Sequence, residues 1–248
     1  MRRLKLVVAY DGANFRGWQR QPARRTVQGV MEEHLSAVLK EPVRLTGAGR
    51  TDTGCHARGQ VASLATTSRL PVAAMAPVLN RRLPSDVRVR EVTEAGPDFD
   101  ARRSAIARRY AYRLLRTEDL LLSRIAWHPP RRFDPEALAR ATAPLEGVQD
   151  FASFRSTGSS AAVSVCHVTR AAWRPWEGGI LLDIVADHFL YHMVRSIVGT
   201  ALVFQSDSDP GARMRECLDG RDRGLAGPTA PAHGLCLEEV FYPDGAPA

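Results

Sequence analysis

Apolar residues recur along the first hundred residues with two alternating periods, which predict strands and helices in turn. Short apolar runs that end on turn-forming or polar residues predict strands at 4–10, 43–48, 60–66 and 86–93. Apolar positions three and four apart predict one helix from the capping residue Thr26 to the stop at Pro42, and another from Pro71 to about Arg82. The resulting order, βαββαβ, is the ferredoxin-like plan that RNA-recognition modules also use.

The remaining residues repeat this order loosely. Alternating patterns predict strands at 109–116, 163–174, 180–187 and 235–242. Helical spacing predicts a helix at 135–145 behind the cap Asp134, a helix at 189–204 and a short helix near 210–219. We therefore expect an α+β protein with two ferredoxin-like, RRM-like βαββαβ halves and antiparallel sheets, an N-terminal half at 1–100 and a C-terminal half at 101–248.

One glycine-rich stretch stands out between the two central strands of the first half. Residues 48–60 contain three glycines and a single carboxylate, Asp52, which lies between two threonines and two positions after Arg50. Glycines allow tight turns, and a nearby cation favours the ionised form of an aspartate. An ionised carboxylate on a fixed turn is a candidate nucleophile or base, so the stretch predicts chemistry at one aspartate.

Two other interpretations of this stretch stay open on the residues alone. Thr-Asp-Thr-Gly is good turn chemistry and often has no catalytic role. Asp-Thr-Gly is also the triplet of aspartic proteases, which need two such carboxylates sharing one proton. Because the chain has one Asp-Thr-Gly, a protease would have to be a dimer, and Arg50 would oppose the shared proton.

Charge is the compositional feature that points to a partner. The net charge is +7, and it is concentrated in residues 1–50, with ten basic and four acidic side chains, and in residues 101–132, with nine and two. Two basic tracts on an otherwise mildly acidic chain indicate a polyanion, with nucleic acid first and a membrane surface second. A hydrophobic content of 44% excludes a disordered chain.

The four cysteines, at 55, 166, 217 and 236, show no paired spacing, so neither a disulfide framework nor a zinc site is indicated. Reduced thiols are the default of a cytoplasmic protein. The apolar run at the N-terminus is too short for a signal-peptide core, and no later run approaches a membrane span. We therefore expect a cytoplasmic protein without a membrane anchor.

Three further segments are candidates for binding. The loop 14–21 interleaves Phe15 and Trp18 with Arg16 and Arg20, which suits stacking and phosphate contacts, although both rings could equally fill the core. Strand alternation places Arg108, Tyr110 and Tyr112 on one face of the strand 109–116.

Helical spacing places four residues on one side of the helix 189–204, opposite its apolar stripe, namely His188, His192, Arg195 and Gly199. A metal site at the two histidines is disfavoured, because no glutamate accompanies them in the pattern of metalloproteases and no third ligand is suggested.

Taken together, these residues resemble the TruA family of tRNA pseudouridine synthases. The matches follow the family's order and span nearly the whole chain: Tyr10-Asp11-Gly12, Gly17-Trp18-Gln19, Gly49-Arg50-Thr51-Asp52-Thr53-Gly54, Asn80-Arg81-Arg82-Leu83-Pro84, Phe99-Asp100-Ala101-Arg102, Arg109-Tyr110-Ala111-Tyr112, Asp150-Phe151 with Ser153-Phe154, His192-Met193-Val194-Arg195 and His233-Gly234-Leu235.

The resemblance implies a cytoplasmic homodimer with the pseudouridine synthase fold, which isomerises uridine at positions 38 to 40 of the tRNA anticodon stem-loop without metal or organic cofactor. Asp52 resembles the catalytic nucleophile, Tyr110 the tyrosine that stacks on the target base, and Arg195 the arginine that pairs with the aspartate. Arg50 resembles the arginine placed by the acid's own loop. The expected tRNA-binding residues are Arg16, Trp18, Gln19, Arg20, Arg58 and His192. A non-catalytic RNA-binding module is the competing interpretation.

The chain departs from the family's usual pattern at a few places. Thr53 and Cys55 stand where the family usually has alanine and valine, and Asp100 stands where histidine is common. The segment 166–170 also fits the family's pattern poorly. The resemblance therefore predicts the tRNA contacts near 155–170 less well than the rest of the site. None of these changes removes a group that the reaction needs.

Overall fold

The computed structural model describes residues 1–156 and 163–243. The chain folds into two compact units. Unit 1 comprises Met1–Ile106 together with the segment from Leu237 onward, and unit 2 comprises Ala107–Cys236. The last strand, which the sequence analysis placed in the C-terminal half, thus has most of its residues in unit 1.

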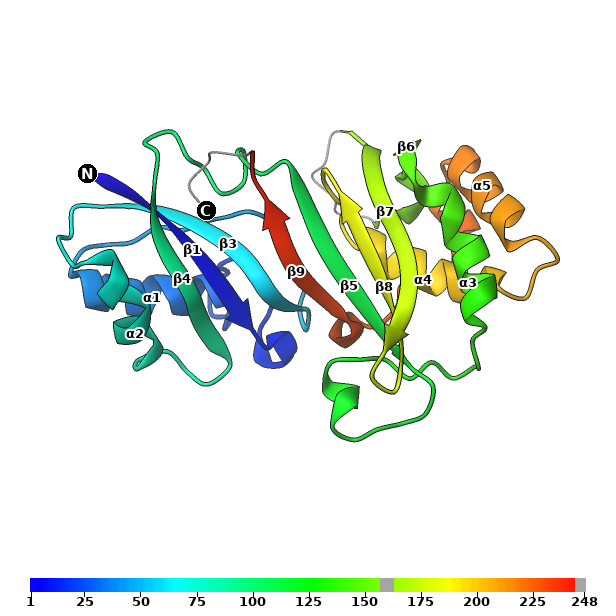
Figure 1. The fold of residues 1–248 in the computed structure, drawn as a ribbon, viewed down its shortest axis with the longest axis horizontal. Helices are drawn as coiled ribbons and strands as arrows, with labels where there is room; N and C mark the ends of the chain where they lie inside the picture. Colours follow the sequence, from blue (N-terminus) through cyan, green and yellow to red (C-terminus); the bar gives the residue numbers. More distant parts are fainter. Residues whose placement is uncertain (157–162, 244–248) are drawn as a thin grey trace. The chain divides into compact units, whose positions relative to one another are not determined.

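Unit 1 is built on an antiparallel sheet (Figure 1). β1 (Arg2–Tyr10) lies between β3 (His56–Thr66) and β4 (Val87–Ala95), with Leu6 opposite both Ala62 and Val92. The two-residue strand β2 (Thr46–Gly47) pairs with the far part of β3, and β9 (Leu235–Phe241) is the other neighbour of β3. Residues 48–55, the acid loop, connect β2 to β3 along the chain.

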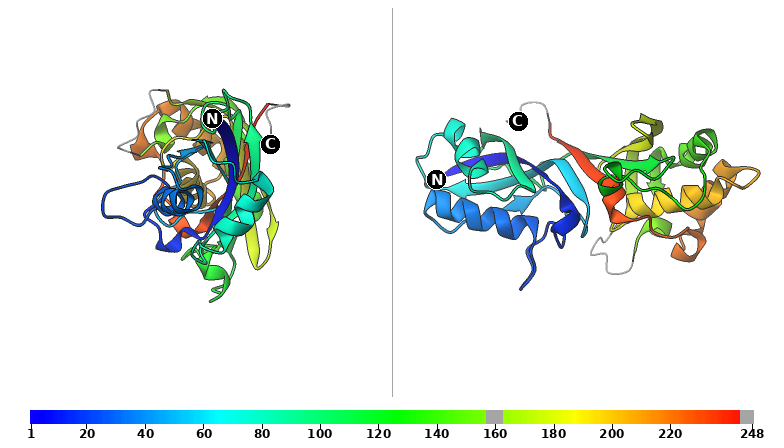
Figure 2. Two further views of the ribbon diagram at one scale, coloured as in Figure 1. Left: turned by 90° about the vertical axis from the view of Figure 1, so that its left-hand side faces the viewer. Right: turned by 90° about the horizontal axis from the view of Figure 1, so that it is seen from below.

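The helices of unit 1 supply the other half of its core. α1 (Val27–Leu39) lies along one face of the sheet, as two views show (Figures 1 and 2). It buries Met31 and Leu35, which follow the predicted helical spacing. α2 (Val72–Asn80) packs against β4 and buries Met75 and Leu79. A 3-10 turn, η1 (Gly12–Asn14), follows β1 immediately.

Unit 2 has its own antiparallel sheet. Its strands lie in the order β5 (Ala107–Leu115), β8 (Gly179–Ala186), β7 (Val165–Trp176) and β6 (Gly147–Asp150). Tyr112 of β5 lies opposite Leu182 of β8, and both side chains are fully buried. On the other face of β5, Arg109 holds the buried carboxylate of Asp183 through two bonds of 2.7 and 3.0 Å.

The helices of unit 2 are α3 (Pro135–Thr142), α4 (Met193–Phe204) and α5 (Pro210–Gly220). α4 is the most buried of them, and it lies behind β8 and β7 in Figure 1. Five 3-10 turns connect these elements, namely η2 (Leu122–Arg124), η3 (Ala143–Leu145), η4 (Ala152–Phe154), η5 (Arg223–Leu225) and η6 (Ala232–Gly234). In the described part of the chain, no helix is long and apolar enough to cross a membrane.

The α+β class and the βαββαβ order of the first unit are confirmed. Three details of the sequence analysis are wrong. The strand expected at 43–48 shrinks to Thr46–Gly47, because the backbone N–H groups of Val43 and Leu45 bond side chains of α1 instead of another strand. The helix expected from residue 189 begins at Met193, since His192 has a left-handed backbone (φ 64°) that cannot continue a helix. The four-residue strand β6 was not expected.

We expect the N-cap of α1 to contribute about 1 kcal/mol to the free energy of unfolding. The hydroxyl oxygen of Thr26 accepts a hydrogen bond from the backbone N–H of Gly29 at 3.3 Å, in a fully buried position. Thr26→Val keeps the shape of the side chain and removes the acceptor, so denaturant unfolding should show this loss. Thr26→Ser keeps the acceptor and is the control; equal losses in both variants would assign the effect to packing.

Candidate functional site

The acid loop, residues 48–55, is a tight turn between β2 and β3. The backbone N–H of Cys55 donates to the carbonyl of Asp52 at 3.1 Å, and Gly54 has the positive φ of 81° that the turn requires. Asp52 is half-buried, while Arg50 and Thr53 on either side are exposed. The turn therefore presents the carboxylate at the edge of solvent.

Hydrogen bonds pin this loop to the segment that follows β1. The hydroxyls of Tyr10 and Thr51 lie 2.7 Å apart in a buried position. The N–H of Trp18 donates to the carbonyl of Thr51 at 3.1 Å, and the N–H of Gly54 donates to Phe15 at 3.4 Å. The loop is thus held by main-chain bonds on both sides of Asp52.

Two glycines of that segment permit an unusually close approach to the acid loop. A Cβ at Gly12 would lie 1.9 Å from the carbonyl oxygen of Cys55, and a Cβ at Gly17 would lie 2.7 Å from that of Thr51. Gly17 also has a positive φ of 81°. Both positions therefore require glycine, and the acid loop packs backbone against backbone.

The base of the loop is held by β3. The side-chain amide of Gln60, which is fully buried, donates to the carbonyl of Gly49 at 2.8 Å. The N–H of Ala48 donates to Val61 at 2.8 Å. Asp52 consequently sits on a turn that is fixed at both ends, which limits the positions that its carboxylate can take.

The loop 14–21 separates core residues from exposed polar residues. Phe15 and Trp18 are 1% and 2% exposed, and the ring of Trp18 lies where a Cβ at Gly47 would collide with it. Both rings thus fill the core, as one of the two alternatives predicts, and a contact of Trp18 with tRNA stays a prediction. Arg16, Gln19 and Arg20 belong to the same loop, and both arginines are exposed.

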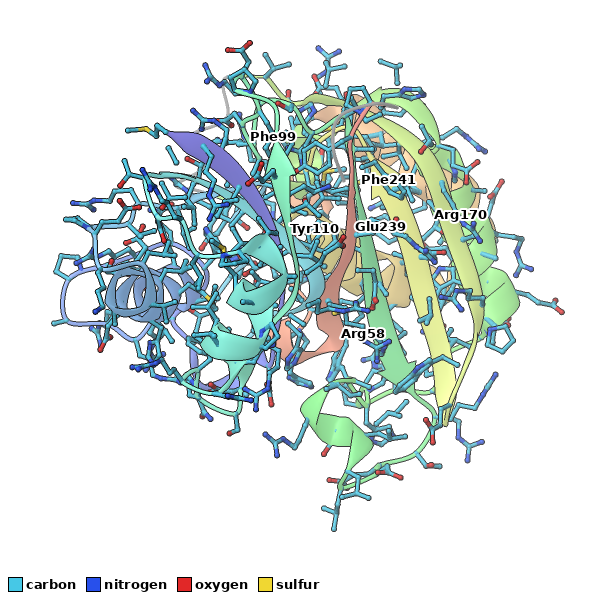
Figure 3. All side chains as sticks on the ribbon, turned by 60° about the vertical axis from the view of Figure 1, so that its left-hand side comes forward. Arg58, Phe99, Tyr110, Arg170, Glu239 and Phe241 are labelled. Atoms are coloured by element: carbon cyan, nitrogen blue, oxygen red, sulfur yellow. The ribbon has the colours of Figure 1, made fainter. Side chains whose placement is uncertain are left out.

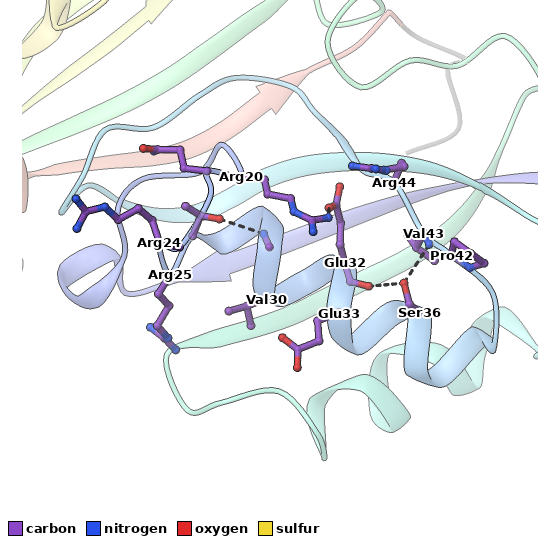
Figure 4. A pocket seen from close by; sticks show the side chains of 14 residues that line it. Arg20, Arg24, Arg25, Val30, Glu32, Glu33, Ser36, Pro42, Val43 and Arg44 are labelled. Atoms are coloured by element: carbon purple, nitrogen blue, oxygen red, sulfur yellow. Dashed lines mark hydrogen bonds and ion pairs between the residues drawn. The ribbon is translucent and has the colours of Figure 1, made fainter.

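A hollow of about 730 Å³ adjoins this loop and α1 (Figure 4). Four arginines line it, namely Arg20, Arg24, Arg25 and Arg44. Arg20 bonds the buried carboxylate of Glu32 at 3.1 Å, and Arg25 holds Asp86 through two bonds of 2.9 Å. The hollow contains no residue of the acid loop, so it is a basic surface feature apart from Asp52.

Arg58 projects from β3 as an exposed side chain, and Arg170 does the same from β7 in unit 2 (Figure 3). The backbone carbonyl of Arg58 accepts a bond from Arg90 at 3.0 Å. The guanidinium of Arg58 is thus carried by a central strand rather than by a flexible loop.

In unit 2, the two candidate tyrosines of β5 are both buried but differ in their surroundings. Tyr110 meets the ring of Phe189 edge to face, with centroids 5.0 Å apart, and is 8% exposed. Tyr112 is completely buried, and its hydroxyl donates to the carbonyl of Pro231 at 2.8 Å. The burial of Tyr112 and its hydrogen bond to Pro231 therefore indicate a structural role within unit 2.

His192 and Arg195 lie together at the start of α4. The Nδ1 atom of His192 lies 3.0 Å from the hydroxyl of Ser156, and the His192 ring stacks on the exposed ring of Tyr191 at 3.8 Å. Arg195 donates through Nε to the carbonyl of Ala230 at 2.8 Å. His188 precedes the helix, so the expected helical spacing between His188 and His192 does not exist.

The segment 227–231 fixes this end of the unit, which the sequence analysis missed. A Cβ at Gly199 would lie 1.7 Å from the carbonyl oxygen of Pro228, so the segment rests directly on α4. The N–H of Gly227 donates to the hydroxyl of Thr200 at 2.8 Å. A glycine in the middle of a predicted helix, Gly199, is the sequence signal that could have indicated this contact.

Three residues depart from the family pattern discussed above, and the structure shows the surroundings of each. Cys55 is buried and Thr53 is exposed at the turn of the acid loop. Asp100 accepts bonds from the N–H groups of Arg102 and Arg103 at 3.0 and 2.8 Å, so it caps a turn. Of the range 155–170, residues 157–162 lie outside the described part of the chain.

Comparisons of the whole chain with known proteins agree with the resemblance that the motifs indicate. A family model described as tRNA pseudouridine synthase matches residues 6–102 and 141–243. A protein named tRNA pseudouridine synthase A from Acetivibrio thermocellus is 39% identical over 98% of this chain and 100% of its own length. Proteins of that name from Moorella thermoacetica and Chloroflexus aurantiacus are both 42% identical, over 96% and 99% of this chain and 99% and 90% of their own lengths.

The close approach at Gly12 gives a test of the loop anchoring. Gly12→Ala should lower the free energy of unfolding by about 1–3 kcal/mol, because the added methyl group meets a backbone carbonyl that cannot rotate away. Denaturant unfolding measures the change. Gly96→Ala is the control, since a Cβ at Gly96 meets nothing within 4 Å. An equal change in the two variants would contradict the close packing.

Proposed function

Because the chain belongs to the tRNA pseudouridine synthase family, whose reaction is the isomerisation of uridine in tRNA, we propose that it acts at positions 38, 39 and 40 of the anticodon stem-loop with Asp52 as nucleophile. The observation that carries the proposal is the single carboxylate on a turn anchored at Thr51, Gly54 and Gly49. A fixed nucleophile loses little freedom when it attacks, which lowers the barrier.

The chemistry needs one nucleophile and a route for one proton. The carboxylate of Asp52 attacks either the sugar C1′, displacing the base at N1, or the base C6. In both routes the bond from C1′ to N1 breaks, the base turns, and C1′ forms a bond to C5. The bond from Asp52 to C1′ or C6 breaks in turn, which returns the free carboxylate. The proton on C5 then leaves to solvent and N1 gains one, so atoms and charge balance. A covalent carboxylate intermediate accounts for the step without a redox group.

Other residues are assigned roles from the family pattern and their surroundings. Tyr110 stacks on the target base and exchanges a proton at its hydroxyl. Arg195 acts as the cation that pairs with the carboxylate of Asp52, and Arg50 is the exposed arginine of the acid loop itself. Arg195 is suited to such a role because its Nε is already held by Ala230, which leaves the guanidinium oriented.

Binding of tRNA would rest on the polar groups of both units. Arg16, Arg20 and Arg58 are exposed on unit 1 and Gln19 lies between the first two, while His192 lies beside the exposed ring of Tyr191 on unit 2. The arginines that line the hollow of Figure 4 add positive potential suited to phosphates. The target base must leave its stack, and an arginine such as Arg58 is suited to fill the gap. The proposed assembly is a cytoplasmic homodimer.

Turnover tests the nucleophile directly. With unmodified tRNA that carries tritium at uridine C5, the wild-type protein should release tritium at positions 38 to 40. Asp52→Ala should reduce this by at least about a thousandfold, since loss of a nucleophile removes the covalent route. Binding of tRNA should stay nearly intact. Asp98→Ala, at an exposed carboxylate of the same unit, is the control.

Two outcomes would overturn this proposal in different ways. Loss of tRNA binding together with turnover in a folded Asp52→Ala protein would reject the assignment of the nucleophile. A folded wild-type protein that binds tRNA but releases no tritium would favour the non-catalytic RNA-binding module.

Substitutions of the two tyrosines on β5 test the role proposed for Tyr110. Tyr110→Phe removes only the hydroxyl and should lower kcat by about 10²- to 10⁴-fold with little change in tRNA affinity, because that hydroxyl moves a proton. Tyr112→Phe should instead lower the free energy of unfolding by about 1 kcal/mol through loss of its bond to Pro231 and leave kcat unchanged. A full kcat in Tyr110→Phe would restrict Tyr110 to stacking.

A further inference from the structure

Three side chains of unit 2 that the reaction does not use converge at the end of the β7–β8 hairpin. The register pairs Val168 with Ala186, and the N–H of Asp187 donates to the carbonyl of His167 at 3.1 Å, which continues the ladder. The next position along brings Cys166 of β7 opposite His188. A thiol, an imidazole and a carboxylate thus meet although 21 residues or more separate Cys166 from the other two.

The distances connect the three groups in a chain. The Sγ atom of Cys166 lies 3.4 Å from Nε2 of His188, and Nδ1 of His188 lies 3.0 Å from Oδ1 of Asp187. The same carboxylate oxygen accepts the N–H groups of His167 and His188 at 3.0 and 2.6 Å. These two backbone bonds hold the carboxylate beside the imidazole.

We propose that Cys166, His188 and Asp187 form a zinc site, with the fourth position taken by water. Zinc lies about 2.3 Å from a thiolate sulfur and about 2.0–2.1 Å from an imidazole nitrogen, so two tetrahedral ligands lie about 3.5 Å apart. The separation of Sγ and Nε2 fits this value. Oδ1 of Asp187 accepts two backbone N–H groups, and the other oxygen of this carboxylate is the third ligand.

In the part of the chain that the structure describes, this is the group of histidine, cysteine and acidic side chains whose ligand atoms lie close enough to share one metal ion, all within 4.8 Å of one another. The thiolate and imidazole favour zinc over magnesium or calcium, which take oxygen ligands.

The local electrostatics also favour a cation. The carboxylates of Asp187 and Asp150 both act on the Cys166 sulfur and give the site a negative potential. Such a potential attracts a divalent ion, which deprotonates a coordinating thiol outright. The balanced step is the loss of the Sγ proton to solvent and the formation of a bond from sulfur to zinc.

The alternative is a cysteine nucleophile activated by His188 and Asp187. A nucleophilic thiol needs a lowered pKa and access to its substrate. Cys166 has neither, because its pKa is raised and it is 1% exposed. His188 and Asp187 are 41% and 46% exposed, so an ion can reach the cluster from solvent where a larger substrate cannot reach the sulfur.

The place of the site gives it a structural consequence. His188 is followed by Phe189, whose ring contacts Tyr110. An ion bound to Cys166 and His188 would tie β7 to the segment that carries Phe189, and so would stabilise the hairpin end beside Tyr110. The zinc site itself does not depend on the proposed tRNA reaction.

Cobalt(II), which replaces zinc and is coloured, provides the test. The full chain, freed of metal with a chelator, should bind one cobalt per chain with a near-ultraviolet charge-transfer band from thiolate to metal, and zinc should displace it. Cys166→Ser should lose the band, while Cys217→Ser should keep it, because Cys217 is buried elsewhere in the same unit. His188→Gln and Asp187→Asn should weaken binding by about 10- to 100-fold.

The proposal is rejected if the wild-type protein shows no thiolate band, if the band survives in Cys166→Ser, or if His188→Gln binds cobalt as the wild type does. Should Cys166→Ser fail to fold, the decision rests on His188→Gln, whose half-exposed side chain can change without opening the core.

Discussion

The backbone contact between the segment after β1 and the acid loop is the constraint on which unit 1 depends. Gly12 and Gly17 bring the two segments so close that no side chain fits between them. The contact orients Thr51 toward Tyr10 and leaves Trp18 no place except the core, against Gly47. The exposed arginines of the loop 14–21 and the half-buried Asp52 are therefore two consequences of one packing arrangement, because the same main chain holds both.

Unit 2 also contains a close backbone contact that a glycine permits. The segment 227–231 rests on α4 through Gly199, and its carbonyls then receive Tyr112 and Arg195, at Pro231 and Ala230. The two side chains come from a strand and a helix that are far apart in sequence. One irregular segment thus fixes both side chains through its backbone carbonyls.

The sequence predicts most elements because their signals are local. Thr26 caps α1, Asp134 caps α3, and the buried positions of α1 follow helical spacing. The errors arise where a distant contact or a backbone strain decides. His192 takes a left-handed conformation that no propensity indicates, so α4 begins late. The ring of Trp18 is buried by Gly47, and single-residue reasoning could not choose between stacking on RNA and filling the core. The candidate aspartate was found because glycine spacing around one carboxylate is itself a local pattern.

The cluster at Cys166 shows the limit of spacing arguments most clearly. Metal sites are recognised in sequences when ligands are neighbours on one turn or helix, and here no two cysteines are close. In a hairpin, however, the residue numbers of two paired positions add up to a constant, so each position on one strand has a fixed partner on the other. A thiol on one strand and an imidazole just past the end of the next strand can therefore face each other, however many residues separate them. The bulge between Val168 and Arg170 shifts this register by one residue. Because a one-residue shift turns a side chain to the opposite face, the pairing of Cys166 with His188 follows from the bulge, which the residue pattern of neither strand reveals.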